Sequence, residues 1–187
     1  MADLSGTPWD RFPGEARPGD RVSKDFQFYE LTRSDLAQRL RIDNAFASPR
    51  ELRAAVNLCR EVLQPLRDKF GRLSPNSVYR CQALERALKK KPASWKSTSQ
   101  HCAGEAADVE IPGMTTLELA RWVERNLKFD QLICECYDPA QGPNSGWVHI
   151  SLKAPGTGEN RGELLSYVYV PRERAYAYVE GLLPSVA

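Results

Sequence analysis

Two histidines and one aspartate are the residues of this chain whose types and spacing suit a metal ion. His101 and Asp108 lie seven residues apart with Gly104 between them, and His149 lies in the segment 146–151. The chain contains no other histidine. Two imidazoles and a carboxylate form the ligand set of a catalytic zinc site whose fourth position stays open for water. The sequence therefore predicts one Zn²⁺ per chain and zinc-dependent hydrolysis.

Three short segments alternate apolar and polar residues, as strands do when a sheet buries one face. They are residues 106–111, 131–137 and 147–153. Because side chains alternate along a strand, Asp108, Glu135 and His149 fall on the faces opposite the apolar residues. Antiparallel sheets commonly bury one face only. We therefore expect an α+β fold in which a small antiparallel sheet carries helices on one face.

A metal-activated water also requires a group that accepts its proton, and carboxylates commonly do so. Glu135 is the best candidate for this catalytic base, because it falls on the face predicted for His149. Glu110 and Asp138 are the alternatives. Arg80 is a candidate for substrate binding, since its planar guanidinium can pair with a substrate carboxylate. An ordinary surface salt bridge explains Arg80 equally well.

Helix signals place the supporting elements. Two capping boxes mark helix starts, at residues 48–51 and 115–118. The first begins a long scaffold helix whose apolar residues recur at helical spacing as far as Phe70, and Gly71 ends it. The pattern at residues 77–81 predicts a further strand.

The two ends of the chain differ in composition from its centre. Residues 1–25 are rich in proline and glycine and predict an extended N-terminal arm, which leaves residues 26–187 as a single zinc peptidase domain. Near the C-terminus, residues 164–170 predict a strand and residues 172–182 a helix.

Bulk composition excludes several classes of protein. The net charge of +2 gives no reason to expect nucleic acid as a partner, and no apolar run is long enough to insert into a membrane. The N-terminus lacks the features of a signal peptide, so we expect synthesis in a cytoplasm. The five cysteines include no Cys-x-x-Cys pair and are expected to be reduced, buried thiols. A monomer is expected.

The metal motif carries a family resemblance that covers approximately residues 24–165. The motif reads Ser99-x-His101-x-x-Gly104-x-Ala106-x-Asp108, followed by Trp147-Val-His149. With it, the chain resembles the M15 zinc peptidases, specifically the phage-type branch related to D-Ala-D-Ala carboxypeptidases and endolysins. The resemblance implies a fold like that of the Hedgehog domain and the DD-peptidases, and cleavage of peptidoglycan stem peptides.

The resemblance also implies roles for individual residues. His101, Asp108 and His149 correspond to the zinc ligands, and Arg80 to an arginine that anchors the substrate. Several relatives place the catalytic glutamate three residues before the last histidine, a position that Gly146 occupies here. The base must then come from elsewhere in the chain.

The leading hypothesis is therefore a zinc peptidase that acts on peptidoglycan muropeptides by means of a metal-activated water. Such a protein would reach the cell wall through a holin, at lysis or as part of a virion. The alternative is a non-catalytic, zinc-containing module of the same fold that binds the cell wall. A redox protein that uses the thiols is a weaker third reading. The scissile bond stays open between D-Ala-D-Ala, L-Ala-D-Glu and a cross-bridge.

Overall fold

The structure is a computed structural model, and it describes residues 1–184. Contacts within the chain group it into two compact units. The first comprises residues 1–107 and 154–158, and the second comprises residues 108–153 and the chain from residue 159 onwards. The division predicted from composition, an arm over residues 1–25 and one domain thereafter, stays a prediction.

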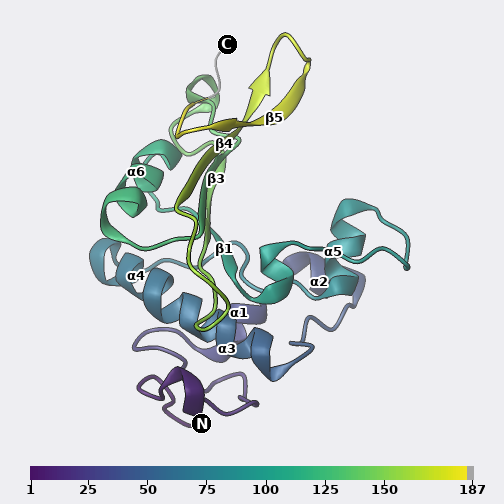
Figure 1. The fold of residues 1–187 in the computed structure, drawn as a ribbon, viewed down its shortest axis with the longest axis vertical. Helices are drawn as coiled ribbons and strands as arrows, with labels where there is room; N and C mark the ends of the chain where they lie inside the picture. The colour runs from purple at the N-terminus through teal and green to yellow at the C-terminus, as the bar shows by residue number, and fades with distance from the viewer. Residues whose placement is uncertain (185–187) are drawn as a thin grey trace. The chain divides into compact units, whose positions relative to one another are not determined.

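The first unit is built on one long helical run, drawn in blue in Figure 1. It comprises α3 (Pro49–Leu58), the π-helical turn η2 (Cys59–Leu63) and α4 (Gln64–Phe70). The wider turn ends two residues before Pro65, whose ring has no N–H to donate and crowds the preceding turn of a regular α-helix. Gly71 ends the run with a positive φ of 82°, as predicted.

The predicted N-cap of this run is confirmed, but its capping box is not reciprocal. The Ser48 hydroxyl accepts a hydrogen bond from the backbone N–H of Glu51 at 3.4 Å. The Glu51 carboxylate accepts instead from the backbone N–H of Ala47, at 2.8 Å, and from the Tyr79 hydroxyl, also at 2.8 Å. Glu51 therefore links the start of the scaffold helix to the segment that contains Arg80.

Short helices and loops complete the first unit. They are η1 (Trp9–Arg11), α1 (Phe28–Thr32), α2 (Asp35–Leu40), α5 (Gln82–Lys89) and η3 (Gln100–Ala103). The strand predicted at residues 77–81 is wrong. This segment is extended, but its backbone bonds to scattered partners, such as the Leu31 carbonyl and the Asn44 side chain, rather than to a neighbouring strand.

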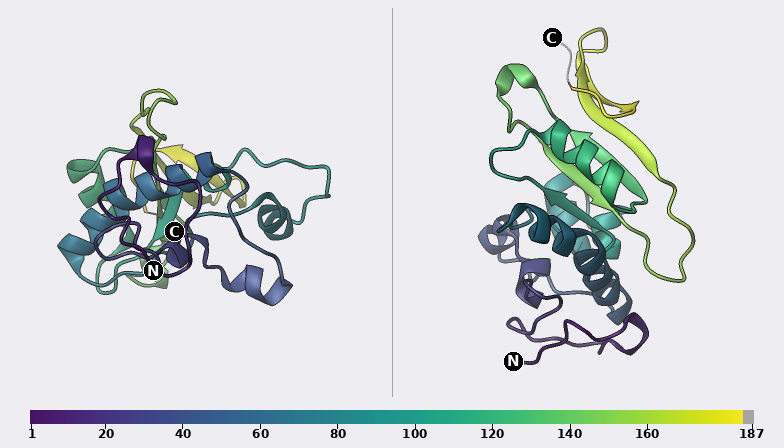
Figure 2. Two further views of the ribbon diagram at one scale, coloured as in Figure 1. Left: turned by 90° about the horizontal axis from the view of Figure 1, so that it is seen from below. Right: turned by 90° about the vertical axis from the view of Figure 1, so that its left-hand side faces the viewer.

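The N-terminal segment packs against the long helical run. The Arg60 guanidinium donates to the backbone carbonyls of Leu4 and Thr7, and Arg53 donates to the carbonyl of Phe12 at 3.1 Å. Phe12 is fully buried. These contacts cover one side of the scaffold helix with the segment drawn in purple in Figures 1 and 2.

The second unit holds most of a five-stranded sheet whose order is β1-β3-β2-β4-β5. The strands are β1 (Ala106–Val109), β2 (Gln131–Glu135), β3 (Trp147–Ser151), β4 (Glu163–Val170) and β5 (Ala175–Glu180). Helix α6 (Thr116–Asn126) packs on β2 and β3 (Figure 2) and starts at the predicted capping box, with Thr115 as its N-cap. The mixture of helices with one sheet is consistent with the predicted α+β class.

The prediction of a purely antiparallel sheet is wrong, because β4 runs parallel to β2. Strands β2 and β3 form an antiparallel pair, with Ile133 opposite His149 and Glu135 opposite Trp147. The long loop after β3 then returns the chain along the sheet, so that β4 enters from the same end as β2 and brings Tyr167 opposite Glu135.

The helix predicted at residues 172–182 is also wrong: this region forms strand β5. Its sequence alternates alanine and tyrosine, a period of two that suits a strand. Tyr178 and Tyr176 lie opposite Tyr167 and Tyr169 of β4. Cross-strand aromatic pairs of this kind stabilise a hairpin and outweigh the helix propensity of alanine.

Asp130 lies where β2 and β4 begin and β3 ends. Its carboxylate is 2% exposed and accepts hydrogen bonds from the Arg161 guanidinium, the shortest at 2.7 Å, while its backbone bonds Ser151 and Glu163. Burial opposes ionisation of Asp130, but the hydrogen bonds and charge of Arg161 outweigh it and lower the pKa of the carboxyl below its ordinary value.

We expect Asp130→Asn to lower the free energy of unfolding at pH 7 by about 1–2 kcal/mol, since the half-exposed Arg161 partner can be rehydrated. A depressed folded-state pKa contributes stability above the unfolded pKa and loses it as the pH falls through the folded one. The difference between wild type and variant should therefore shrink below roughly pH 4. Urea unfolding at pH 7 and pH 3 measures it, and an equal difference at both values would contradict this role.

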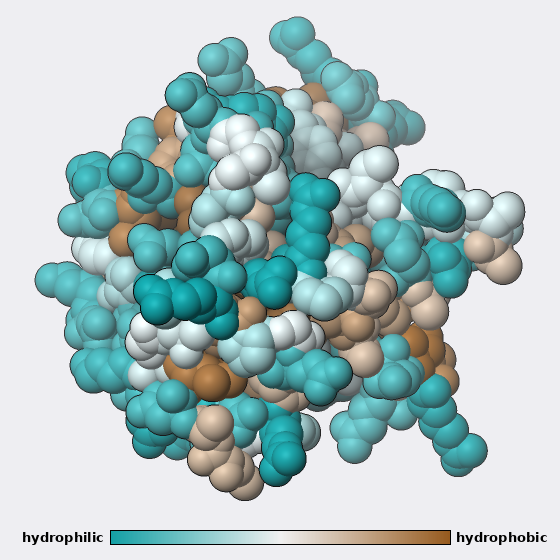
Figure 3. Space-filling model, turned by 60° about the horizontal axis from the view of Figure 1, so that its bottom comes forward, coloured by the Kyte–Doolittle hydropathy of each residue, from teal (hydrophilic) through white to brown (hydrophobic). Residues whose placement is uncertain are grey.

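The surface drawn in Figure 3 is mostly hydrophilic, and hydrophobic residues form small separate patches on it. Within residues 1–184, no helix has the length and apolar character needed to span a membrane.

Candidate active site

His101 lies in the short helix η3 of the first unit and is held by the segment before Arg80. Its side chain is 1% exposed, and its Nδ1 atom lies 2.7 Å from the Val78 carbonyl oxygen. A carbonyl can only accept, so Nδ1 carries the proton, and Nε2 is the ring nitrogen that can act as a metal ligand. Metal-binding histidines are commonly oriented by such a bond to a backbone carbonyl.

Gly104 lets the chain turn from η3 into β1 between the two residues of the metal motif. Its φ is +74°, and a Cβ atom here would lie 2.3 Å from the Glu51 carbonyl oxygen. Only glycine fits this close contact with the scaffold helix, which explains its place between His101 and Asp108.

We expect Gly104→Ala to lower the free energy of unfolding by about 1–3 kcal/mol or more, for two reasons. Alanine is strained at a positive φ, and its Cβ atom would clash with the Glu51 carbonyl oxygen. Thermal unfolding measures this loss. Gly113→Ala is the matched control, since Gly113 has a similar φ of +82° with nothing within 4 Å of the added carbon. A loss of stability equal in the two variants would show that contact with the helix is unimportant.

Asp108 and His149 meet on neighbouring strands of the second unit. Strands β1 and β3 are adjacent in the sheet, and the Nδ1 atom of His149 lies 3.1 Å from Oδ1 of Asp108. The two residues are 8% and 6% exposed. The alternation of each strand places these polar groups away from its apolar neighbours, as the sequence predicted.

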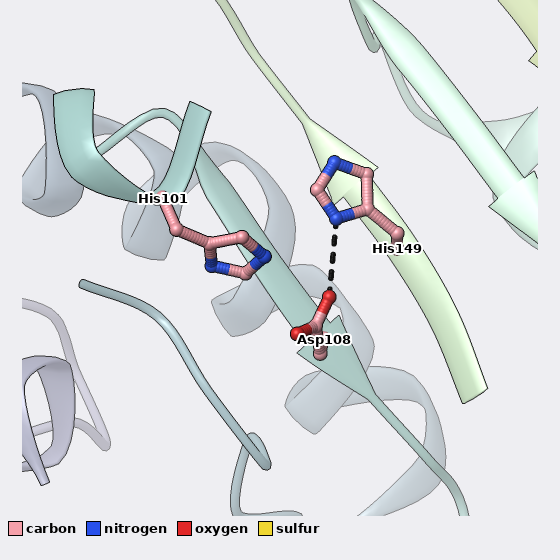
Figure 4. Close-up of side chains that lie close together, drawn as sticks. All are labelled: His101, Asp108 and His149. Carbon is pink, nitrogen blue, oxygen red and sulfur yellow. Dashed lines mark hydrogen bonds and ion pairs between the residues drawn. The ribbon is translucent and has the colours of Figure 1, made fainter. Parts of the chain in front are cut away.

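Figure 4 shows the side chains of His101, Asp108 and His149 close together. One ligand atom from each lies within 4.8 Å of the other two. Donor atoms of a tetrahedral zinc site stand roughly 3.4 Å apart when each bond is about 2.1 Å long, so the observed spacing suits a metal after small side-chain adjustments. Two neutral imidazoles and a carboxylate also match zinc chemically.

The segment that contains the three ligand candidates matches a known protein family. A family model described as Peptidase M15 matches residues 24–151. The chain belongs to the peptidase M15 family. The match includes every residue predicted for the site and ends at the last residue of β3, so β4 and β5 lie outside it. No curated protein and no solved structure matches the chain.

M15 peptidases are zinc-dependent metallopeptidases, so the family accounts for the donor set found here. The three candidates come together in the structure as predicted from their spacing. Their assignment as zinc ligands remains a prediction that the metal itself must test.

Glu135 of this M15 family chain lies on the same face of the sheet as His149. Ile133 is opposite His149, and Glu135 follows two residues later on β2, so both side chains point to one side. Glu135 is half-buried. Of the alternatives, Glu110 is exposed beyond the end of β1, and both carboxylate oxygens of Asp138 accept hydrogen bonds within its own loop. Glu135 therefore stays the prediction for the base, with Glu110 and Asp138 as the alternatives.

Arg80 forms an ion pair that sequence reasoning did not identify. Its Nε atom lies 2.9 Å from Oε2 of Glu85, whose side chain is 2% exposed, and its backbone N–H donates to the His101 carbonyl at 3.3 Å. Arg80 also lines a cavity of about 510 Å³ together with Ser77 and other polar residues. The missed signal was Glu85 itself, an acid beside Leu84 in the first turn of α5, where its burial needs a cation.

Three of the five cysteines, Cys59, Cys102 and Cys134, are buried and do not have the properties of reactive thiols. Burial raises the pKa of Cys59 and Cys134 to about 12 and that of Cys102 to about 11. A thiol is nucleophilic and binds metal only as the thiolate, which these residues do not form at neutral pH. The redox reading therefore loses its support.

Proposed function

We propose that this chain is a zinc-dependent peptidase that cleaves the stem peptides of peptidoglycan, and that it is of the phage endolysin type with a Hedgehog/DD-peptidase-like fold. The observation that carries the proposal is the buried cluster of His101, Asp108 and His149 inside the segment that matches the M15 family. Two imidazoles and a carboxylate whose ligand atoms lie within 4.8 Å of one another form a donor set that zinc takes.

The bound metal and the side chains that hold it would contribute differently to catalysis. When bound, zinc would polarise the scissile carbonyl and bring the pKa of a coordinated water towards about 7. The chain contributes ligands that are already oriented: the bond to the Val78 carbonyl fixes the ring of His101, and strand pairing fixes Asp108 and His149. Oriented ligands reduce the entropy that metal binding must overcome.

Glu135 is proposed as the general base. From the face that carries His149, its carboxylate would take a proton from the attacking water and then pass that proton to the leaving amine. A half-buried position suits this task, because the carboxylate is held by its strand while access to substrate is retained.

Arg80 is proposed to bind a carboxylate of the substrate. Glu85 holds its Nε atom and so orients the guanidinium, Nη1 donates to the Ser77 hydroxyl at 3.3 Å, and both residues line the cavity. An anchored arginine recognises a carboxylate with less loss of side-chain entropy than a free one. A peptide that ends in D-alanine, or one that contains D-glutamate, presents such a group.

Digestion of purified muropeptides tests the proposal. The zinc-loaded chain should convert them to products whose masses, read by mass spectrometry, identify the bond: loss of terminal alanine indicates a carboxypeptidase, and separation of the stem from the sugar-linked alanine indicates an endopeptidase. A chelator should stop the reaction, and added zinc should restore it. Intact muropeptides after incubation with fully zinc-loaded protein would refute peptidase activity on this substrate.

One observation favours the alternative, a zinc-containing module that binds the wall without cleaving it. Gly146 occupies the position at which several relatives carry the catalytic glutamate, and a Cβ there would lie 2.0 Å from the Glu135 carbonyl oxygen. No side chain fits this position, so catalysis depends on another acid. Binding of the zinc-loaded chain to purified cell walls, without any turnover and without an effect of Glu135→Gln, would support the alternative.

A further inference from the structure

The register of the sheet in the second unit sets an aromatic row beside the proposed base. Trp147, Glu135, Tyr167 and Tyr178 lie opposite one another on β3, β2, β4 and β5. Residues in register point to the same side of a sheet, so this row shares its face with His149. Glu135, the proposed base, therefore has an aromatic residue on each side of it in the sheet: Trp147 on β3 and Tyr167 on β4.

Tyr169 and Tyr176 extend this row along the β4–β5 hairpin, and together with Tyr167 and Tyr178 they form what we call the tyrosine face. Ring centroids of Tyr167 and Tyr178 lie 4.7 Å apart, and those of Tyr169 and Tyr176 lie 5.6 Å apart. Tyr178 is 59% exposed, and Tyr169 and Tyr176 are 41% and 44% exposed. Cross-strand packing explains why these rings touch, but it does not require so much ring surface to face solvent.

A hollow of about 440 Å³ adjoins the tyrosine face. Trp147 and Tyr176 form part of its wall, and the loop between β2 and β3 supplies the polar side chains of Gln141, Asn144 and Ser145. None of the residues that line it is charged. Aromatic walls with a few amide and hydroxyl groups form a site for a neutral ligand that has both apolar surface and hydrogen-bonding groups.

We propose that the tyrosine face and its hollow bind a saccharide chain. A pyranose ring has apolar C–H faces that pack on aromatic rings, and its hydroxyl and acetamido groups pair with phenol and amide groups. Nucleic acid is disfavoured at the hollow, because no lysine or arginine lines it and a phosphate backbone requires such residues along the surface that binds it. The choice of polymer rests on the proposed function: the occupant is the N-acetylated glycan of the cell wall, held while its stem peptide reaches the catalytic residues.

The β-1,4-linked pentamer of N-acetylglucosamine is the probe, titrated into the full zinc-loaded chain by calorimetry. We expect saturable binding that Tyr178→Ala and Tyr176→Ala each weaken roughly tenfold. Tyr178→Phe, which keeps the ring, should retain most of the affinity. Tyr29→Ala is the matched control, because Tyr29 is a 45% exposed tyrosine on α1 and lies in the first unit.

Asn144→Ala keeps the proposal testable if a tyrosine variant fails to fold, since this exposed loop residue makes no packing contribution to the hairpin. It should also weaken binding. Absence of pentamer binding, or an equal loss in Tyr29→Ala and Tyr178→Ala, would overturn the proposal. The probe contains no peptide bond, so its binding is independent of hydrolysis: binding without muropeptide cleavage would refute the peptidase and leave this surface standing.

Discussion

His149→Ala is expected to abolish both zinc retention and muropeptide cleavage. The variant removes one of three ligand candidates and leaves the buried Asp108 carboxylate without the imidazole that lies 3.1 Å from it. Two remaining ligands bind zinc far more weakly than three, and without the metal no group activates the water. We expect activity to fall roughly a thousandfold or more. Metal analysis of the purified variant and the rate of product formation measure the two losses.

Cys136→Ser is the matched control for this experiment. Cys136 lies half-buried directly after β2, and its thiol is a zinc-binding group that does not belong to the three ligand candidates. The control should keep one zinc per chain and full activity. An active His149→Ala variant, or loss of zinc in the cysteine variant alone, would show that the metal is held by other residues.

Glu135→Gln should separate chemistry from metal binding. The amide keeps the size of the side chain but cannot accept the proton of the attacking water, so hydrolysis should fall by about 10²–10⁴ while zinc content stays at one per chain. Rates under single-turnover conditions and metal analysis on the same sample measure both quantities.

The alternative acids supply the controls for Glu135. Glu110→Gln changes an exposed group beyond β1, and Asp138→Asn changes a carboxylate that caps its own loop. Both variants should remain close to wild type in rate. A large loss in either of them, with Glu135→Gln active, would reassign the base and remove the role that strand register gives to Glu135.

The sequence predicted correctly those features that depend on a few neighbouring residues, such as the face of a strand or the start of a helix. The alternation of residues 131–137 and 147–153 was enough to place Glu135 and His149 on one face, because that face depends only on a period of two. The capping residues at 48 and 115 were equally local signals, and both helices begin there.

The features that the sequence did not predict depend on residues far apart in the chain. Alternation identifies the faces of β4 but not its direction, which is set by the loop that returns to Asp130 and by the Arg161 pair there. Likewise, the sequence does not show that Tyr178 lies opposite Tyr167 and Tyr176 opposite Tyr169, although the alternation with alanine is itself a strand period. The burial of Glu85 against Arg80 belongs to the same class, since an ion pair is a property of the folded chain.

Anomalous diffraction at the zinc absorption edge, from crystals of the zinc-loaded chain, tests the central claim most directly. One strong peak that contacts His101, Asp108 and His149 is the result expected of a metallopeptidase site. A peak bound by other side chains, or no peak near these three in fully loaded crystals, would contradict it.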